Sequence, residues 1–337
     1  MTDTGIVVIT GASAGLGRAT ARAFARRGWA VGLIARGVDR LEATRREVEI
    51  LGGRALWVSA DVADAEAVER AADYFENRLG PIDVWINSAM VTVFSPLSAV
   101  SAAEFQRVVN VTLMGQVHGT MAALRRMRAR NRGTIVQVGS ALAWRAIPLQ
   151  SAYCAAKHGV RGFTDSLRSE LLHDGSRVRL TMVQMPALNT PQFDWARNHL
   201  RRRPQPLAPI FQPEFAAEAV VRAALEAPRE LWVGRSSVTA ILAGMFFPGV
   251  VDRILANTAY AGQQSGNPDD PGRPDNLQGA VAGPFRAHGR FDATAQRWGF
   301  AVGQKTMDRF MIGGLLALMM STVALGALAL RRRLQRT

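Results

Sequence analysis

The stretch IVVITGASAGLGRATARAFARR, residues 6–27, decides the fold of this chain. Its first five residues are apolar or β-branched and predict a short buried strand, and a helical pattern follows the glycine-rich turn. Glycine lets the backbone turn tightly and approach a ligand, and the N-terminus of a helix presents unpaired N–H groups to an anion. The stretch therefore predicts a pyrophosphate site formed by residues of this turn, Gly11, Ser13, Gly15, Leu16 and Gly17.

Strands and helices alternate along the next two hundred residues. Further apolar, β-branched runs lie at residues 30–35, 55–59, 82–86, 134–138, 178–183 and 231–233. This alternation predicts an α/β fold, a Rossmann-type doubly wound parallel sheet of about seven strands. Ligands of such sheets bind at the carboxyl ends of the strands. The residues at or just after those ends are candidate binding residues: Asp61, Val62, Asn87, Ala89, Ser140 and Pro186.

Two arginines follow the second predicted strand, where the type of dinucleotide is usually decided. Sites that prefer NAD place a carboxylate there for the ribose hydroxyls, whereas Arg36 and Arg40 suit a 2′-phosphate. We therefore expect NADP(H) to be favoured. NAD(H) stays open as the alternative, because both residues could be ordinary surface arginines in a chain rich in arginine.

The segment SAYCAAKHGVRG, residues 151–162, carries the candidate chemistry. It reads as a helix, so Tyr153 and Lys157 lie one turn apart on one face. A free tyrosine has a pKa near ~10, and a neighbouring cation lowers it toward the working range of an acid–base catalyst. Only Lys157 and Lys305 are lysines among 41 basic residues, which indicates that a compact ammonium is needed at this position.

Taken together, these motifs resemble the short-chain dehydrogenase/reductase family over about residues 4–235. The resemblance implies a hydride transfer between a nicotinamide cofactor and a carbonyl or alcohol. It implies that Tyr153 is the general acid or base, that Lys157 lowers its pKa and holds the nicotinamide ribose, and that Ser140 hydrogen-bonds the substrate oxygen. It also implies that Asn110 helps to hold a water that relays protons to Lys157.

The resemblance assigns further cofactor contacts and also shows two departures. It implies that Asp61 contacts the adenine and that Thr190 contacts the nicotinamide amide. The family usually has Asn-Asn-Ala-Gly after the fourth strand and Pro-Gly after the sixth. Here Met90 and Ala187 replace the two glycines, so we expect a different cofactor fit or pocket shape. Neither departure removes a catalytic group.

The substrate region is expected at residues 187–213. It contains Phe193 and Trp195, the three consecutive arginines at 201–203, and then Pro204, Pro206, Pro209 and Pro213. The arginines could meet an anionic substrate group, or the segment could be a surface lid whose arginines face water. The sequence leaves both interpretations open.

Composition limits the partners of this chain of 337 residues. Its net charge is +14, but arginine is spread along the whole chain and no nucleic-acid-binding motif is found, so we expect no nucleic-acid partner. A DNA partner would show as strongly salt-dependent affinity in a gel shift. The single cysteine, Cys154, excludes an intramolecular disulfide, and the five histidines show no metal-ligand spacing, so we expect no metal site.

The C-terminal third divides into four further segments after the catalytic domain at residues 1–235. Residues 236–262 form an apolar helical extension that could cover the substrate pocket, form a dimer surface or lie on a membrane, and residues 263–309 are expected to be a flexible linker. Residues 310–330 contain 21 residues without a charge, long enough to cross a bilayer, and a basic tail follows at 331–337. A re-entrant or surface-lying helix is the alternative to a transmembrane helix.

The leading hypothesis is a membrane-anchored, NADP(H)-dependent oxidoreductase with its catalytic domain in the cytoplasm. Anchoring in the bilayer would suit a lipophilic carbonyl or alcohol substrate. The rival hypothesis is a non-catalytic NADP(H)-binding sensor or interaction protein. By family resemblance we expect a homodimer or homotetramer.

Overall fold

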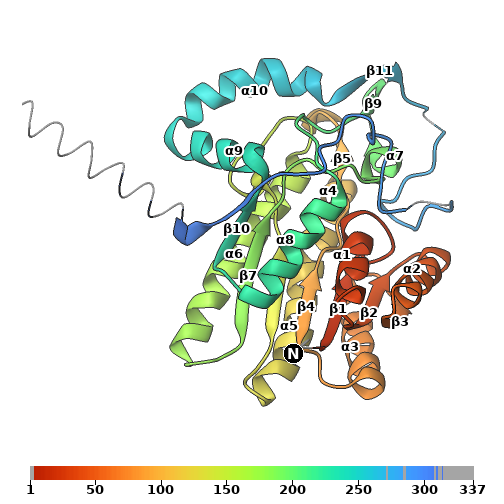
Figure 1. The fold of residues 1–337 in the computed structure, drawn as a ribbon. Coiled ribbons are helices and arrows are strands. Elements are labelled where there is room, and N and C mark those ends of the chain that lie inside the picture. The colour runs from red at the N-terminus through yellow and green to blue at the C-terminus, as the bar shows by residue number, and fades with distance from the viewer. Residues whose placement is uncertain (1–3, 271, 284–285, 307–308, 310–312, 314–337) are drawn as a thin grey trace, which may run out of the picture.

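The computed structural model describes residues 4–270, 272–283, 286–306, 309 and 313. Among these residues the main sheet has eight strands, in the order β12-β10-β7-β6-β4-β1-β2-β3 (Figure 1). All neighbours pair in parallel except β10 and β12, which confirms the predicted doubly wound α/β fold. The strands of this sheet are β1 (Ile6–Thr10), β2 (Ala30–Ala35), β3 (Arg54–Ser59), β4 (Val84–Asn87), β6 (Thr134–Val138), β7 (Arg179–Gln184), β10 (Glu230–Val233) and β12 (Ala301–Gly303).

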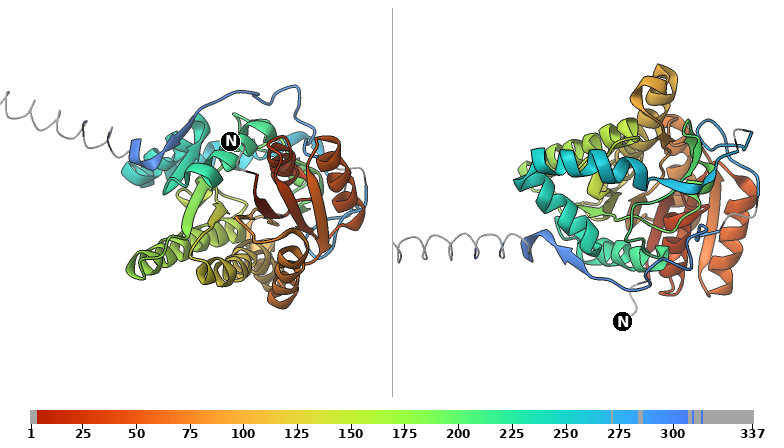
Figure 2. Two further views of the ribbon diagram at one scale, coloured as in Figure 1. Left: turned by 60° about the horizontal axis from the view of Figure 1, so that its bottom comes forward. Right: turned by 90° about the horizontal axis from the view of Figure 1, so that it is seen from above.

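Helices cover both faces of the sheet and enclose two apolar cores (Figure 2). Because successive side chains of a strand point to opposite faces, β1 gives Val7 and Ile9 to one core and Val8 to the other. One face is covered by α1 (Gly15–Ala25), α2 (Val38–Ile50) and α8 (Pro213–Glu226). The other is covered by α3 (Ala65–Leu79), α4 (Ala102–Val109), α5 (Gly115–Ala129) and α6 (Ser151–His173).

Four short strands and one short helix lie in the loops above the sheet. The strand β5 (Val93–Phe94) pairs with β8 (Arg197–Asn198), next to α7 (Gln192–Trp195). The strand β9 (Arg202–Pro204) pairs with β11 (Gln264–Pro268). The predicted substrate region, residues 187–213, contains β8 and β9, so it pairs with one earlier and one later segment of the chain.

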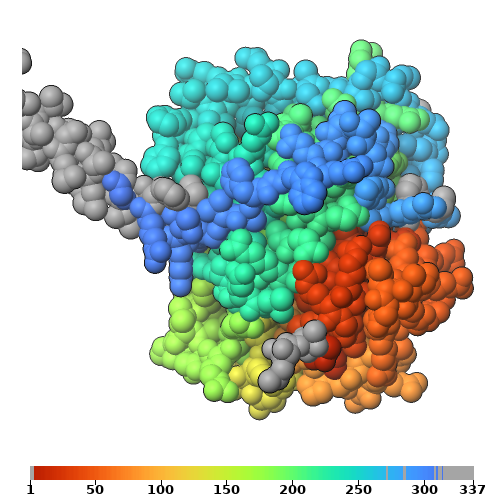
Figure 3. All heavy atoms as spheres, in the orientation of Figure 1, coloured from red at the N-terminus to blue at the C-terminus, as the bar shows by residue number. Residues whose placement is uncertain are grey.

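Residues 263–309 differ from the linker that the sequence predicts. Leu277, Val281 and Ala287 are buried, and β12 extends the main sheet by pairing with β10. We call residues 275–283 and 286–289 the strap, and Figure 3 shows the blue C-terminal segment lying across the surface of the domain. A few apolar side chains in a polar, turn-rich stretch hold it in place, and such isolated residues carry no periodic signal.

The hairpin formed by α9 (Gly234–Phe246) and α10 (Pro248–Gly262) occupies the region predicted as an apolar helical extension. It covers the carboxyl edge of the sheet near β10 (Figure 1). Across the part of the chain that the structure describes, no helix has both the length and the apolar character needed to cross a bilayer. The predicted transmembrane segment, residues 310–330, lies outside the described residues except for Gly313.

Candidate active site

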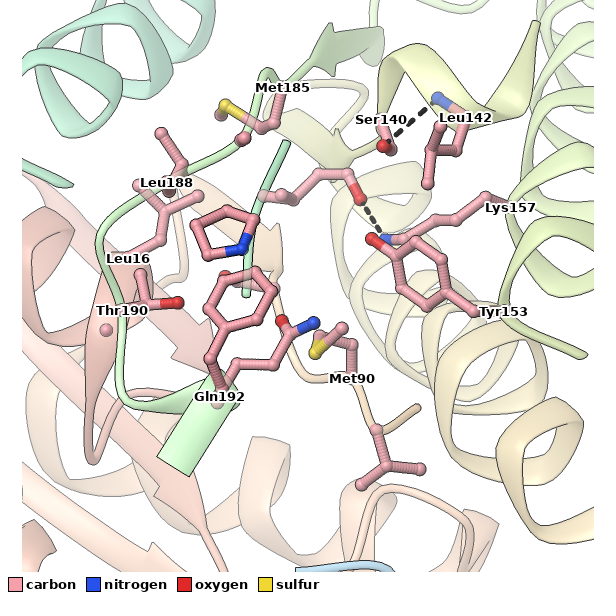
Figure 4. Close-up of a pocket in the computed structure, with 18 of the residues that line it drawn as sticks. Leu16, Met90, Ser140, Leu142, Tyr153, Lys157, Met185, Leu188, Thr190 and Gln192 are labelled. Carbon is pink, nitrogen blue, oxygen red and sulfur yellow. Dashed lines mark hydrogen bonds between the residues drawn. The ribbon is translucent and has the colours of Figure 1, made fainter. Parts of the chain in front are cut away.

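A cavity of about 470 Å³ lies at the carboxyl edge of the sheet, below the α9–α10 hairpin. Figure 4 shows Ser140, Tyr153 and Lys157 on one side of it, with Leu16 and Thr190 on the other. All predicted catalytic and cofactor-binding residues line this cavity except Asn87 and Asn110. Those that do are Gly11, Ser13, Gly15, Leu16, Gly17, Arg36, Arg40, Asp61, Val62, Ala89, Ser140, Tyr153, Lys157 and Thr190.

The glycine turn after β1 has the geometry that its sequence predicts. Gly11 and Gly15 have φ angles of +71° and +54°, which favour glycine, and a Cβ atom on Gly17 would lie 2.3 Å from the carbonyl oxygen of Gly11. The hydroxyl of Thr10 accepts hydrogen bonds from the N–H groups of Ser88 and Ala89, which ties the ends of β1 and β4 together. Since α1 also begins here without a side-chain cap, the turn fits a pyrophosphate.

Arg36 and Arg40 lie at the end of the cavity formed by β2, and both contact the strap. Arg36 donates to the carbonyl oxygens of Asn276 and Leu277 and lies 3.9 Å from the carboxylate of Asp61. Arg40 donates to the carbonyl oxygen of Val281. Because a guanidinium has five N–H donors, the two carbonyl contacts of Arg36 orient it without using all of its capacity for a phosphate.

The strap also reaches other walls of this end of the cavity. Arg107, at the end of α4, donates to the carbonyl oxygen of Leu277 at 2.9 Å and forms an ion pair with Asp61. The carbonyl oxygen of Arg286 accepts from the N–H of Gly15 at 3.1 Å. Sequence reasoning missed the strap, and Asn276 and Ala280 belong to the wall of the cavity.

Tyr153 and Lys157 come from the first two turns of α6, and Ser140 follows β6 (Figure 4). The Nζ atom of Lys157 donates to the carbonyl oxygen of Val138 at 2.7 Å and lies 5.6 Å from the centre of the Tyr153 ring. The Oγ atom of Ser140 accepts from the N–H of Leu142 at 3.1 Å. Two hydroxyls and one amine therefore converge on one wall of the cavity.

Burial is the main influence on the pKa values of Tyr153 and Lys157. It raises the pKa of Tyr153 above its usual range, and the hydrogen bond with Ser140 opposes this only in part. Burial also lowers the pKa of Lys157 to about 7. Burial is the largest influence on the pKa of Tyr153 here, and it acts against the lowering that the sequence predicts from Lys157. Tyr153 is thus a protonated phenol at neutral pH.

The helical region that contains Asn110 is interrupted by a π-helical turn, Asn110–Met114, between α4 and α5. Asn110 lies outside the cavity wall, and its Oδ1 atom accepts from Nε2 of Gln106 at 2.7 Å. Thr112 is fully buried instead. Its hydroxyl donates to the carbonyl oxygen of Val91 at 2.9 Å and accepts from the N–H of Val91 at 3.1 Å. Since Val91 lines the cavity, these two hydrogen bonds fix the backbone of a residue in its wall.

Asn87 has a structural role in place of the predicted cofactor contact. It is fully buried, and its Oδ1 atom accepts from the indole N–H of Trp85 at 2.8 Å. Its Nδ2 atom donates to Thr120 and Gln137, each at 3.0 Å. These bonds join β4, α5 and β6 behind the cavity.

The cavity wall beyond Ser140 is largely apolar. Met90 and Ala187, the two departures from the family pattern, both line it. The hydroxyl of Ser237, at the start of α9, is buried and has no hydrogen-bond partner among the described residues. The apolar side chains of this wall come from the loops and from both helices of the hairpin: Leu142, Ile147, Leu188, Phe193, Leu207, Ala240, Val251 and Leu255.

Comparisons with known proteins agree with this geometry. The family model described as short chain dehydrogenase matches residues 5–200. An uncharacterized oxidoreductase of Bacillus subtilis, YxnA, is 32% identical over 82% of this chain and 79% of its own length. The ketoacyl reductase HetN of a Nostoc species is 30% identical over 74% of this chain and 87% of its own length.

A solved structure supports the same assignment. An alcohol dehydrogenase from the archaeon Thermococcus sibiricus, in complex with 5-hydroxy-NADP, has a TM-score of 0.58 and 30% identity to this chain. The match covers 68% of this chain and 96% of that one. The fold and the converging Ser140, Tyr153 and Lys157 define a dinucleotide-binding oxidoreductase. The chain belongs to the short-chain dehydrogenase family.

Proposed function

We propose that this protein is a membrane-anchored, NADP(H)-dependent oxidoreductase that acts on a lipophilic carbonyl or alcohol. The observation that carries the proposal is the position of Ser140, Tyr153 and Lys157 on one wall of a cavity that is otherwise largely apolar. The cofactor, when bound, supplies or accepts the hydride.

In this proposal the residues of the chain handle the substrate oxygen and its proton. The protonated phenol of Tyr153 donates its proton to that oxygen during reduction. The Ser140 hydroxyl donates a hydrogen bond to the same oxygen as negative charge develops there. Lys157, held by the carbonyl oxygen of Val138, is the cation that favours the resulting phenolate and speeds its formation.

The preference for NADP(H) rests on charge. Arg36 and Arg40 line the end of the cavity near Asp61, and Arg107 forms an ion pair with that carboxylate. This excess of positive charge suits a 2′-phosphate. The NADP derivative in the archaeal alcohol dehydrogenase, which is 30% identical, supports the same choice.

The membrane anchor and the lipophilic substrate are linked parts of the proposal. Residues 310–330 carry no charge over a length that matches the hydrocarbon core of a bilayer. The catalytic domain would then lie on the cytoplasmic side, and its apolar cavity would receive substrates that partition into lipid. We also expect a homodimer or homotetramer, as the family resemblance implies.

The test is the oxidation of NADPH and NADH by the full-length protein in detergent, against a panel of small polar and long-chain carbonyls. We expect turnover with NADPH that is fastest with long-chain carbonyls. A protein that binds NADPH tightly but turns over none of the panel would contradict the proposal and support a non-catalytic sensor.

A further inference from the structure

The turn between α9 and α10 exposes an uninterrupted apolar stretch. Residues 245–250 read MFFPGV and contain no polar or charged side chain. Met245, Phe246, Phe247 and Val250 are between 45% and 65% exposed, and Ile254, one turn further along α10, is 53% exposed. Single exposed apolar residues are common, but consecutive aromatic residues at the tip of a hairpin mark an interaction surface. We call residues 245–250 and Ile254 the hairpin tip.

The same two helices separate the hairpin tip from the cavity. Ala240 of α9 and Val251 and Leu255 of α10 line the cavity, one to five residues away from exposed members of the tip. Arg145 fixes the arrangement, because it donates to the carbonyl oxygen of Pro248 and forms an ion pair with Asp252. The hairpin therefore has one apolar face toward the cavity and another toward the outside.

The hairpin tip and the start of the uncharged C-terminal stretch lie on the same side of the molecule. The edge strand β12 pairs with β10, and β10 runs directly into α9 at Gly234. Figures 1 and 2 show the hairpin and the last blue segment of the chain projecting beyond this edge of the sheet. The uncharged stretch begins at residue 310, shortly after β12 ends at Gly303.

Charge near the hairpin suits an anionic lipid surface. Arg235 and Arg253 are exposed on α9 and α10, and Lys305 and Arg309 precede the uncharged stretch. Asp252, the acidic residue of the hairpin, is paired with Arg145. Aromatic side chains flanked by exposed arginines are typical of segments that lie at the boundary between headgroups and acyl chains.

The small size of the hairpin tip favours a bilayer over another protein as the partner of this surface. The hairpin helices have 13 and 15 residues, so neither is long enough to span a bilayer. The tip has few side chains, whereas each side of a stable protein interface contributes roughly 20–30 residues. Shallow insertion into lipid needs only a small apolar tip.

We infer that the hairpin tip inserts into the headgroup–acyl boundary of the bilayer and places the hairpin wall of the cavity next to the lipid. A lipophilic substrate would then reach the cavity from the membrane along α9 and α10. This inference rests on the proposed function, because the anchor at residues 310–330 would bring the tip to the bilayer.

The test uses the full-length chain and a single environment-sensitive label. Cys154 is 4% exposed and burial raises the pKa of its thiol to about 11, so a maleimide dye reacts selectively with an introduced cysteine. Phe247→Cys places the dye on the tip. Ile50→Cys is the matched control, because Ile50 is 83% exposed on α2, far from the hairpin (Figure 1). Both proteins are reconstituted into phosphatidylcholine–phosphatidylglycerol vesicles with or without nitroxide-labelled lipid.

We expect nitroxide lipid to reduce the emission of the dye at position 247 roughly twofold or more and to leave the dye at position 50 unchanged. A chain that sediments with the vesicles while neither dye is quenched would overturn the inference and leave the anchor intact. A chain that stays in the supernatant would overturn both the anchor and the inference. A disulfide between copies of Phe247→Cys in detergent, with no quenching in vesicles, would assign the tip to a second copy instead.

Discussion

Lys157 is the buried lysine of the site, and its environment makes the stability of the fold depend on pH. Only 2% of the residue is exposed, and its ammonium donates to the carbonyl oxygen of Val138. The folded protein releases this proton above a pKa of about 7, whereas the unfolded chain holds it up to about 10.5. The unfolded state therefore binds more protons between these values, so stability rises with pH across that window.

We expect the free energy of unfolding of the native protein to rise relative to that of Lys157→Met between pH 7 and pH 9. The difference should grow by up to about 1.4 kcal/mol per pH unit, since methionine does not titrate. Denaturant titrations of both proteins in detergent at several pH values measure it. Parallel curves for the two proteins would show that Lys157 keeps an ordinary pKa in the fold.

Thr112 is expected to matter more than Asn110. Thr112→Val keeps the shape of the side chain but leaves the N–H and the carbonyl of Val91 without their partner, which costs about 1–3 kcal/mol for buried groups. Asn110→Ala removes only a contact with the exposed Gln106 and serves as the control. The midpoint temperature of thermal unfolding and the turnover rate should fall for Thr112→Val alone. Equal losses in the two variants would contradict the assignment.

For single residues, the sequence predicts the position correctly where the chemistry requires one residue type. Tyr153, Lys157, Ser140 and the glycines of the turn lie where their motifs place them. Asn110 does not line the cavity, and the π-helical turn that begins at this residue shifts the helical phase of the side chains that follow it. A helical period read from the sequence cannot contain such a shift.

Among the elements, the strap has the closest connection to the dinucleotide site. Leu277 is fully buried, and its carbonyl oxygen accepts from Arg36 and Arg107. We expect Leu277→Asp to detach the strap, because a carboxylate in an apolar core costs several kcal/mol. Dissociation of NADPH, followed by stopped-flow fluorescence, should become roughly tenfold faster or more, as a loss of about 1.4 kcal/mol implies.

Gln278→Asp is the matched control for this prediction, since Gln278 is exposed on the same strap and receives the same charge. Its NADPH dissociation rate should match that of the native protein. Unchanged dissociation in both variants would show that the strap does not hold the cofactor.

The elements differ in how far the sequence reveals them. Most strands of the parallel sheet are rich in apolar residues, because both of their faces are buried, and the sequence predicts all seven. The strap and β12 are held by a few side chains and by main-chain hydrogen bonds. Such bonds are available to any sequence, so they leave no pattern of residue types.

For the whole molecule, the proposed anchor predicts a physical property that can be measured directly. We expect the full-length chain to stay in the membrane pellet after an alkaline carbonate wash, because 21 uncharged residues bury far more apolar surface than the hairpin tip. A chain that ends at residue 306 should move to the supernatant. Release of the full-length chain by the wash would contradict a transmembrane anchor and favour a surface-lying helix.

The measurement that tests the central claim most directly compares the native protein with Tyr153→Phe. The variant removes one hydroxyl from the cavity wall and leaves the ring and the adjoining Lys157 in place. We predict that Tyr153→Phe binds NADPH with unchanged affinity but loses at least about a hundredfold in carbonyl-dependent NADPH oxidation, as expected when a general acid is removed. Turnover that survives in Tyr153→Phe at the native rate would contradict the account.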